Sequence, residues 1–348
     1  MKFHLFLKKV FFIVASSIFI GCVNVRNIDP SPIVSPPLVS SEVVGSPFPT
    51  PTDTLLLPAT TQPVLSGRIA ILNVSRKYTK IALLDLQTSK IQNIQNPELD
   101  RAFDAFSWSP DGKWIVVGGL FPEFQNSHLL LMSPDGDSIN LSSYPQGANP
   151  DWSPNGKQII YNSTKGFAIF DITGERTFQL TYPTGLAYYP AWSPDGTSVA
   201  YVYNQNTSSS EMFDKKWELW IVNSNGKDAR PVISDFPIVR SPLDWSPDSK
   251  YITFISLDGK ASNMCGDIYI VKSDGTDLTR LTSLDECATN VSWSTNGKKI
   301  AFIGRNKNVD KDIMKSGWQI YVMDSDGKNI TQVTDESEWV LYGLAWKP

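Results

Sequence analysis

Acidic residues in short turns are the side chains of this chain whose type and spacing could bind a metal ion. They follow Ser or Ser-Pro, and most precede Gly directly; they are Asp111, Asp135, Asp195, Asp248, Asp274 and Asp326. An EF-hand calcium loop needs acids at alternate positions, Gly at position six and a late Glu. In Asp324-Ser-Asp326-Gly327 the Gly arrives at position four. Because Asp-Gly is a common hairpin signal, we interpret these acids as turn residues and expect no metal and no cofactor.

Catalytic groups have few candidates in this sequence. His128 is the one histidine outside the first residues, and we place it at the start of a strand, on the rim. A serine hydrolase of the α/β type needs a Gly-x-Ser-x-Gly elbow, which does not occur, and Gly112 follows Asp111 too closely for a glycosidase Asp-box. We therefore predict no catalytic residue and a protein that is not an enzyme.

Composition excludes further classes of function. The 348 residues include 31 Lys and Arg against 35 Asp and Glu, for a net charge of −4. Such a balance does not neutralise a phosphate backbone, so nucleic acid is not expected as a partner. Hydrophobic residues make up 41% and charged residues 19% of the chain, which is ordinary for a globular protein with a large core.

The N-terminus has the pattern of a secretory signal. Lys2, Lys8 and Lys9 precede an apolar run over residues 10–20, which is followed by Gly21 and Cys22. A membrane-spanning helix needs about 20 apolar residues, so this run is short for a permanent anchor. The ending Phe19-Ile-Gly-Cys22 resembles the bacterial lipobox, and this resemblance implies a signal peptide over 1–21 and lipidation of Cys22. Plain secretion and an uncleaved anchor are the alternatives.

Residues 22–65 differ in composition from the rest of the chain. Nine of the 24 prolines fall between Val23 and Leu65, together with only four charged residues. Such a stretch buries too little apolar surface to offset the loss of chain entropy. We expect a disordered tether between the lipidated cysteine and the folded domain.

Residues 66–348 consist of repeats of one unit. Each unit carries Trp followed in most copies by Ser-Pro-Asp-Gly or a close variant; the tryptophans are Trp108, Trp152, Trp192, Trp245, Trp293 and Trp346. Their mean spacing of about 48 residues suits a four-stranded propeller blade. The stretch from Arg68 to Val74 matches the second strand of a unit, and the chain reaches Trp346 on a first strand. We therefore predict an all-β, six-bladed propeller with 3+1 ring closure, and tryptophans packed between blades.

The Trp-Ser-Pro-Asp-Gly-Lys pattern resembles the TolB-type propeller repeat. This resemblance implies a non-catalytic binding protein of the bacterial cell envelope, located in the periplasm or on the cell surface. TolB proteins carry an α/β domain before the propeller, whereas this chain has a Pro-rich tether there, so a TolB-like role toward peptidoglycan-associated lipoprotein does not follow directly.

The long loops between units, and those between second and third strands, should lie on one face of the propeller. We predict that their aromatic residues bind a protein, peptide or cell-wall partner; they are Phe121, Phe124, Tyr144, Tyr182, Tyr188, Tyr189, Phe213, Phe236, Trp339 and Tyr342. Two further readings stay open for the chain: a hydrolase or lyase using funnel acids such as Asp100, Asp104 or Glu338, and a purely structural envelope component. As an alternative to partner binding, these aromatic side chains would only fill the mouth of the central channel of the propeller. We expect a monomer, attached to the membrane through its N-terminal lipid.

Two cysteines, Cys265 and Cys287, remain once Cys22 is lipidated. An even number in an oxidising compartment favours a disulfide. In the predicted blade both lie on the loop-bearing face, so we predict a bridge between them; two buried free thiols are the alternative.

Overall fold

The computed structural model describes residues 65–74, 79–94, 102–121, 126–135, 138–140, 147–163, 166–172, 177–180, 185–205, 217–257, 266–283, 287–305, 317–335 and 341–348. The predicted signal peptide, Cys22 and the tether lie outside these residues. So does Cys265, while Cys287 is described in its backbone only. In the described part of the chain no helix is long and apolar enough to cross a membrane.

Every regular element of the described residues is a β-strand, which confirms the predicted all-β class. Three sheets of four antiparallel strands come from consecutive segments of the chain. They are β4 (Ala102–Trp108), β5 (Ile115–Phe121), β6 (Asn126–Met132) and β7 (Ser138–Asn140); β8 (Gly147–Trp152), β9 (Gln158–Ser163), β10 (Gly166–Asp171) and β11 (Thr177–Leu180); and β20 (Cys287–Trp293), β21 (Lys299–Arg305), β22 (Trp318–Asp324) and β23 (Thr331–Gln332).

A fourth sheet combines the two ends of the folded unit. Strand β24 (Leu341–Trp346) pairs with β1 (Arg68–Val74), which continues to β2 (Thr79–Asp85) and β3 (Ile91–Asn93). The register places Ile69 opposite Trp346 and Ile71 opposite Leu344. Because β1 lies between β24 and β2, it is the second strand of this sheet, which agrees with the prediction for the segment that starts at Arg68.

The remaining eight strands form one sheet. It contains β12 (Leu186–Trp192), β13 (Ser198–Asn204), β14 (Trp217–Asn223), β15 (Arg230–Ile238), β16 (Asp244–Trp245), β17 (Tyr251–Ser256), β18 (Asp267–Lys272) and β19 (Thr279–Arg280). Two repeat units are joined in it, because β15 is nine residues long and Ile238 pairs with Ser256 of β17. We call β12–β15 the third unit and β16–β19 the fourth unit.

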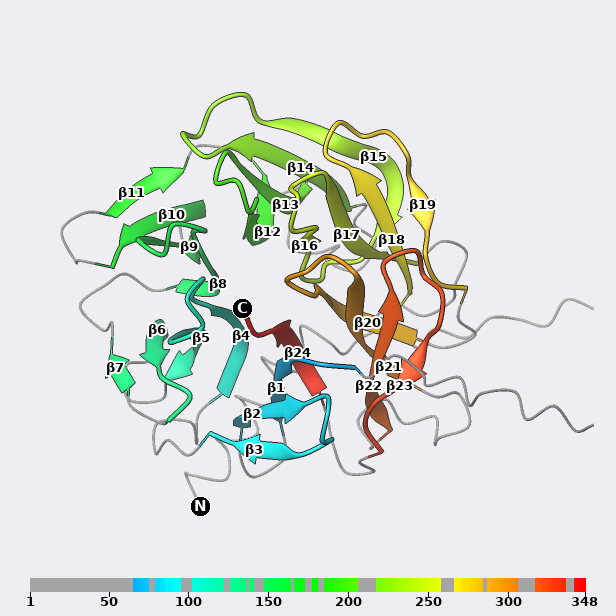
Figure 1. The fold of residues 1–348 in the computed structure, drawn as a ribbon. Coiled ribbons are helices and arrows are strands. Elements are labelled where there is room, and N and C mark those ends of the chain that lie inside the picture. Colours follow the sequence, from blue (N-terminus) through cyan, green and yellow to red (C-terminus); the bar gives the residue numbers. More distant parts are fainter. Residues whose placement is uncertain are drawn as a thin grey trace, which may run out of the picture. The chain divides into compact units, whose positions relative to one another are not determined.

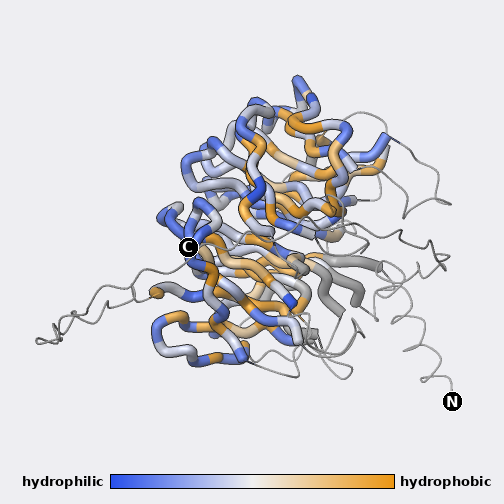
Figure 2. Tube along the Cα trace, turned by 90° about the vertical axis from the view of Figure 1, so that its right-hand side faces the viewer, coloured by the Kyte–Doolittle hydropathy of each residue, from blue (hydrophilic) through white to orange (hydrophobic). Residues whose placement is uncertain are grey.

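The sheets surround a common centre, and the strands that end in the repeat tryptophans lie innermost (Figure 1). These first strands contact one another in the cyclic order β4, β8, β12, β16, β20, β24 and again β4. Hydrophobic stretches follow the strands and hydrophilic stretches the turns (Figure 2).

The core is divided into six clusters of buried apolar side chains, and each cluster contains one repeat tryptophan. Trp108, for example, packs with Ile115 of its own sheet and with Leu83 of the sheet before it. All six tryptophans are buried. The predicted packing of these side chains between neighbouring sheets is confirmed.

The Ser-Pro-Asp-Gly turns form the same hydrogen-bonded arrangement in five copies. In the first, Ser109 Oγ donates to Asp111 Oδ1 at 2.7 Å, the Lys113 N–H donates to the same oxygen, and the Trp114 N–H donates to Ser109 Oγ. The hydrogen bond from Ser109 holds the pKa of Asp111 below its usual value. Asn155 and Asn296 occupy the place of the acid in two copies. The interpretation of Asp111, Asp195 and Asp248 as turn residues is thus confirmed.

Candidate functional site

Most of the predicted partner-binding aromatics lie outside the residues whose side chains the structure describes. Phe124, Tyr144, Tyr182, Phe213 and Trp339 belong to segments that are not described, and Phe121 and Tyr342 are described in the backbone only. The structure also does not describe the side chains of the acids considered for catalysis, Asp100, Asp104 and Glu338, or the ring of His128. Tyr188, Tyr189 and Phe236 are described fully.

Tyr188 belongs to a cluster that joins three segments of the third unit and its exit. Its ring meets the Trp217 ring edge to face, with centroids 5.7 Å apart. The guanidinium carbon of Arg240 lies 4.7 Å from the Tyr188 centroid and 6.0 Å from that of Trp217. We call Tyr188, Trp217 and Arg240 the cation-π cluster. It brings residues from β12, β14 and the β15–β16 connection together.

The guanidinium of Arg240 has N–H donors that bind no group within the described residues. Within the described residues it takes part in no hydrogen bond or ion pair, although its guanidinium carries five N–H donors. Arg240 and Tyr188 are partly buried, and Trp217 is buried. The guanidinium is therefore held over the Tyr188 ring, and its N–H donors can bind an incoming carboxylate.

Tyr189 lies beside this cluster in a conformation that is rare for its residue type. Its φ is +54°, in the left-handed region. The register between β12 and β13 shifts between Tyr188 and Ala191, so these residues form a β-bulge. Pro190, which has no N–H to donate, occupies the interrupted stretch. Register shifts at the same place in β8 and β20 show that this bulge is a common feature of the first strands.

The same bulge occurs in β8, where Asn149 has a φ of +46° and the register shifts between Ala148 and Asp151. We expected Tyr188 and Tyr189 in the loops that join the units, but they belong to the first strand β12. The prediction was wrong about the strand boundaries, because a bulge interrupts the regular alternation that marks a strand in the sequence while the pairing continues beyond it.

Phe236 is part of the packing of β15 on the fourth unit. Its ring lies 5.1 Å from Tyr269 and 6.1 Å from Phe254, edge to face in both cases. It is half-buried. These contacts are those of a side chain that covers the core.

Side chains that precede the repeat tryptophans link the first strands to one another. At four junctions this side chain accepts a hydrogen bond from the backbone N–H of the tryptophan in the next unit; the pairs are Ser107 with Trp152, Asp151 with Trp192, Asp244 with Trp293 and Ser292 with Trp346. At the other two junctions the position holds Ala191 or Ala345. Neighbouring inner strands are thus held together by side chains.

Two of these linking side chains are carboxylic acids whose pKa values are raised above the ordinary value. Burial raises the pKa of Asp151 to about 6, against the hydrogen bonds from Ser107 and Trp192. Burial, with repulsion from Asp151 as a further cause, raises the pKa of Asp244 to about 7, and the hydrogen bond from Trp293 opposes this shift. Acids with raised pKa values occur at catalytic sites, but they also occur in structural hydrogen-bond networks. Here both carboxylates bind backbone N–H groups of the next unit, which is a structural role.

Within the described ranges no three His, Cys, Asp or Glu side chains come together in the manner of metal ligands. Sequence reasoning did not single out Trp217, Arg240 or the linking acids. Asp151 and Asp244 carried a signal in retrospect, since both directly precede a repeat tryptophan. Trp217 and Arg240 carried none, because they lie outside the repeated motif.

Comparisons with known proteins agree with this architecture. Residues 148–317 match the family model of the TolB beta propeller domain, PD40. An uncharacterized protein of Agrobacterium fabrum, Atu1656, is 26% identical over 284 residues, which cover 74% of this chain and 84% of that protein.

Solved structures show the same fold. TolB from Acinetobacter baumannii superposes with a TM-score of 0.62 at 18% identity, covering 81% of this chain and 67% of that one. A putative TolB from Agrobacterium tumefaciens gives a TM-score of 0.59 at 19% identity, covering 81% and 99% of the two chains. Together with the family match over residues 148–317, these likenesses show a β-propeller fold similar to that of TolB proteins.

Proposed function

We propose that this chain is an envelope lipoprotein whose TolB-like propeller acts as a non-catalytic scaffold for a protein or peptide partner. The binding face is the loop-bearing end of the sheets, and the cation-π cluster with Tyr189 is its centre. The partner presents a carboxylate, from an acidic side chain or a chain terminus, to Arg240. The protein acts as a monomer in the periplasm or on the cell surface.

The observation that carries this proposal is the state of Arg240. Its guanidinium carbon lies 4.7 Å from the Tyr188 centroid and 6.0 Å from the Trp217 centroid, and the group has no acidic partner among the described residues. Aromatic residues and Arg are the side chains most enriched where interfaces gain their binding energy.

The scaffold in this proposal is a six-bladed propeller over residues 66–348 with 3+1 closure. The pairing of β24 with β1 and the cyclic contacts of the first strands support it. A signal peptide over 1–21, lipidation at Cys22 and a tether over 22–65 would hold the propeller near a membrane. The composition of these segments supports this arrangement.

Site-specific crosslinking in the native envelope tests the proposal. A photo-reactive amino acid at position 189 should give a discrete adduct with a partner protein, and Arg240→Gln in the same chain should abolish it. The control position is Lys157, in the turn at the other end of a first strand. Equal adducts at 157 and 189, or an adduct at 189 that Arg240→Gln leaves unchanged, would contradict the proposed face.

A further inference from the structure

The junction between the third and fourth units departs from the repeat in its inner strands. Ala191 stands where four other junctions have Ser or Asp, so it offers no side-chain acceptor to the next tryptophan. The Trp245 N–H instead binds the carboxylate of its own neighbour, Asp244, at 2.9 Å. The Trp245 indole donates to the Ala191 carbonyl at 3.1 Å, whereas the indole nitrogens of Trp108, Trp152, Trp192 and Trp293 have no partner in the described structure.

The turns at this junction also depart from the repeat. Thr197 follows the Gly of the third turn, where the other Ser-Pro-Asp-Gly-type turns have Lys. Ser249 replaces the Gly of the fourth turn and keeps the left-handed conformation, with a φ of +60°. Its hydroxyl accepts a hydrogen bond from the Asp195 N–H at 3.0 Å, which ties the two turns together. Local departures of this kind from an otherwise regular pattern are expected at functional sites.

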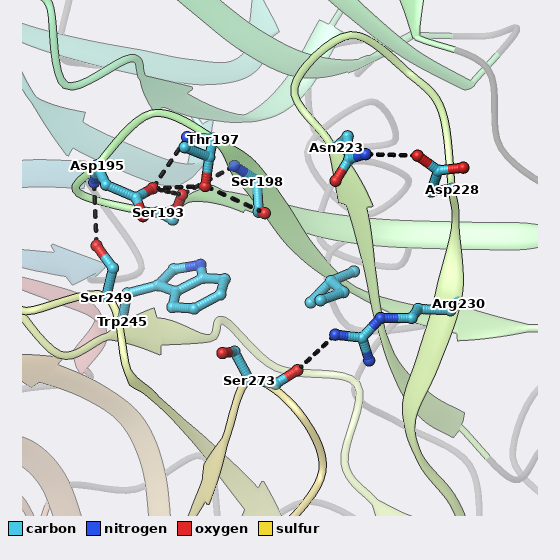
Figure 3. Close-up of a pocket in the computed structure, with 11 residues that line it drawn as sticks. Ser193, Asp195, Thr197, Ser198, Asn223, Asp228, Arg230, Trp245, Ser249 and Ser273 are labelled. Carbon is cyan, nitrogen blue, oxygen red and sulfur yellow. Dashed lines mark hydrogen bonds between the residues drawn. The ribbon is translucent and has the colours of Figure 1, made fainter.

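A pocket of about 220 Å³ lies at this junction, on the turn side of the sheets. Asp195, Thr197 and Ser249 line it from the two turns, and Trp245 and Ile221 supply apolar surface. Figure 3 shows Asp195 and Arg230 on opposite sides of it, with Asp228 on the side of Arg230. The pocket is separate from the cation-π cluster, with which it shares no residue.

Asp195 stands on one side of the pocket and Arg230, together with Asp228, on the other; all three are exposed, and none forms an ion pair within the described residues. Arg230 donates from its guanidinium to the Ser273 carbonyl at 3.0 Å, which spans the junction and positions the group. Asp195 Oδ1 accepts from Ser193 and Thr197, and Oδ2 accepts no hydrogen bond from the described residues. Neither Asp195 nor Arg230 forms an ion pair in that part of the chain.

Equivalent turns neutralise their acid locally. Lys113 lies 3.7 Å from Asp111, and Lys250 lies 3.1 Å from Asp248. With Thr197 in place of Lys, the third turn loses this cation. Burial opposes ionisation of Asp195, but the hydrogen bonds from Ser193 and Thr197 lower its pKa on balance, so it is a carboxylate at neutral pH.

We propose that this pocket binds a small zwitterion of the size of an amino acid, with its ammonium group on Asp195 and its carboxylate on Arg230. The volume equals that of about seven water molecules at ~30 Å³ each, which is enough for a ligand of that class. The hydroxyls of the turns supply further polar contacts. The pocket would give the propeller a small-molecule site distinct from its partner-binding face.

Ligand-observed NMR of the full chain with a mixture of the twenty common α-amino acids is the first test. At least one of them should show saturation transfer, and the bound compound should lose at least tenfold in affinity as its α-amide or as its N-acetyl derivative. Absence of transfer from all twenty would overturn the proposal. Binding of the amide and N-acetyl derivatives as tight as that of the parent amino acid would also overturn it. Glucose serves as a neutral polar compound in the same experiment, and saturation transfer to glucose but to no amino acid would indicate a pocket for neutral polar ligands and overturn the proposal as well.

Charge-removing variants locate the binding. Asp195→Asn and Arg230→Gln should each weaken it at least tenfold. The first variant should fold, because Asn155 and Asn296 fill the same turn position in other units, and a melting curve checks this. Asp248→Asn, the same change in the next turn and outside the pocket, is the matched control and should leave binding unchanged. Binding that survives both pocket variants would place the ligand elsewhere and refute the assignment.

Discussion

The two linking carboxylates should make the propeller less stable as pH rises from about 4 to about 7. Asp244 has a pKa of about 7 in the folded protein against an ordinary 3.8, and Asp151 one of about 6. Between the ordinary and the raised value the folded state binds more protons than the unfolded state. The free energy of unfolding therefore falls with rising pH in this window and stays low above it.

The magnitude follows from the size of the shift. Each pKa unit corresponds to about 1.4 kcal/mol, so a shift of about three units for Asp244 is equivalent to about 4 kcal/mol when fully realised. Asp244 keeps partial contact with solvent, which screens the charge. We expect about 2 kcal/mol from this residue between pH 5 and pH 8.

Asp244→Asn isolates this contribution. The amide oxygen can still accept the Trp293 N–H, while the charge is removed, so the variant should be more stable than the wild type at both pH values, by about 2 kcal/mol more at pH 8 than at pH 5. Urea unfolding followed by tryptophan fluorescence at the two pH values measures both quantities.

Asp248→Asn serves as the control, because a hydrogen bond from Ser246 holds the pKa of Asp248 below its ordinary value. The stability that Asp248 contributes is lost only as pH falls below about 4, so this variant should not alter the change between pH 5 and 8. A wild type equally stable at both pH values, or an Asp244→Asn variant with the same pH dependence as the wild type, would refute the reasoning.

Three further predictions concern the anchor, the closing strand and the cysteines. Cys22→Ala should move the protein from the detergent phase to the soluble fraction, and a variant that stays membrane-bound would contradict lipidation at this residue. Deletion of 341–348 removes β24 and exposes the edge of β1, so calorimetry should show loss of cooperative unfolding; a melting curve like that of the full chain would contradict 3+1 closure. Mass mapping of unreduced peptides should show Cys265 bridged to Cys287, closing a loop of about 22 residues worth roughly 3 kcal/mol, and two alkylatable thiols would exclude the bridge.

The cysteine prediction has support from the neighbouring residues. The backbone of Gly266 pairs with that of Ala288, with N–H to carbonyl distances of 3.1 and 3.0 Å. Each of these residues follows one of the cysteines in the chain. Reduction should weaken partner binding on this face more than it lowers the melting temperature of the propeller.

Much of the fold could be predicted from the sequence because its signals are local. A Ser-Pro-Asp-Gly turn contains its own hydrogen-bond donors and acceptors, as Ser109 and Asp111 show. Each turn is followed by an apolar strand, and repetition of the pair revealed the unit and the buried position of tryptophans such as Trp108. These features depend on residues within a few positions of one another.

The candidate sites depend on residues that are distant in the sequence, and only the tertiary structure brought them together. Tyr188, Trp217 and Arg240 belong to three segments, and nothing in their local patterns indicates that they meet. Asp195 and Arg230 look like ordinary polar residues until the junction of two units places them on opposite sides of one pocket. Local sequence thus determined the repeating unit, whereas the packing of distant segments decided where the cation-π cluster and the pocket form.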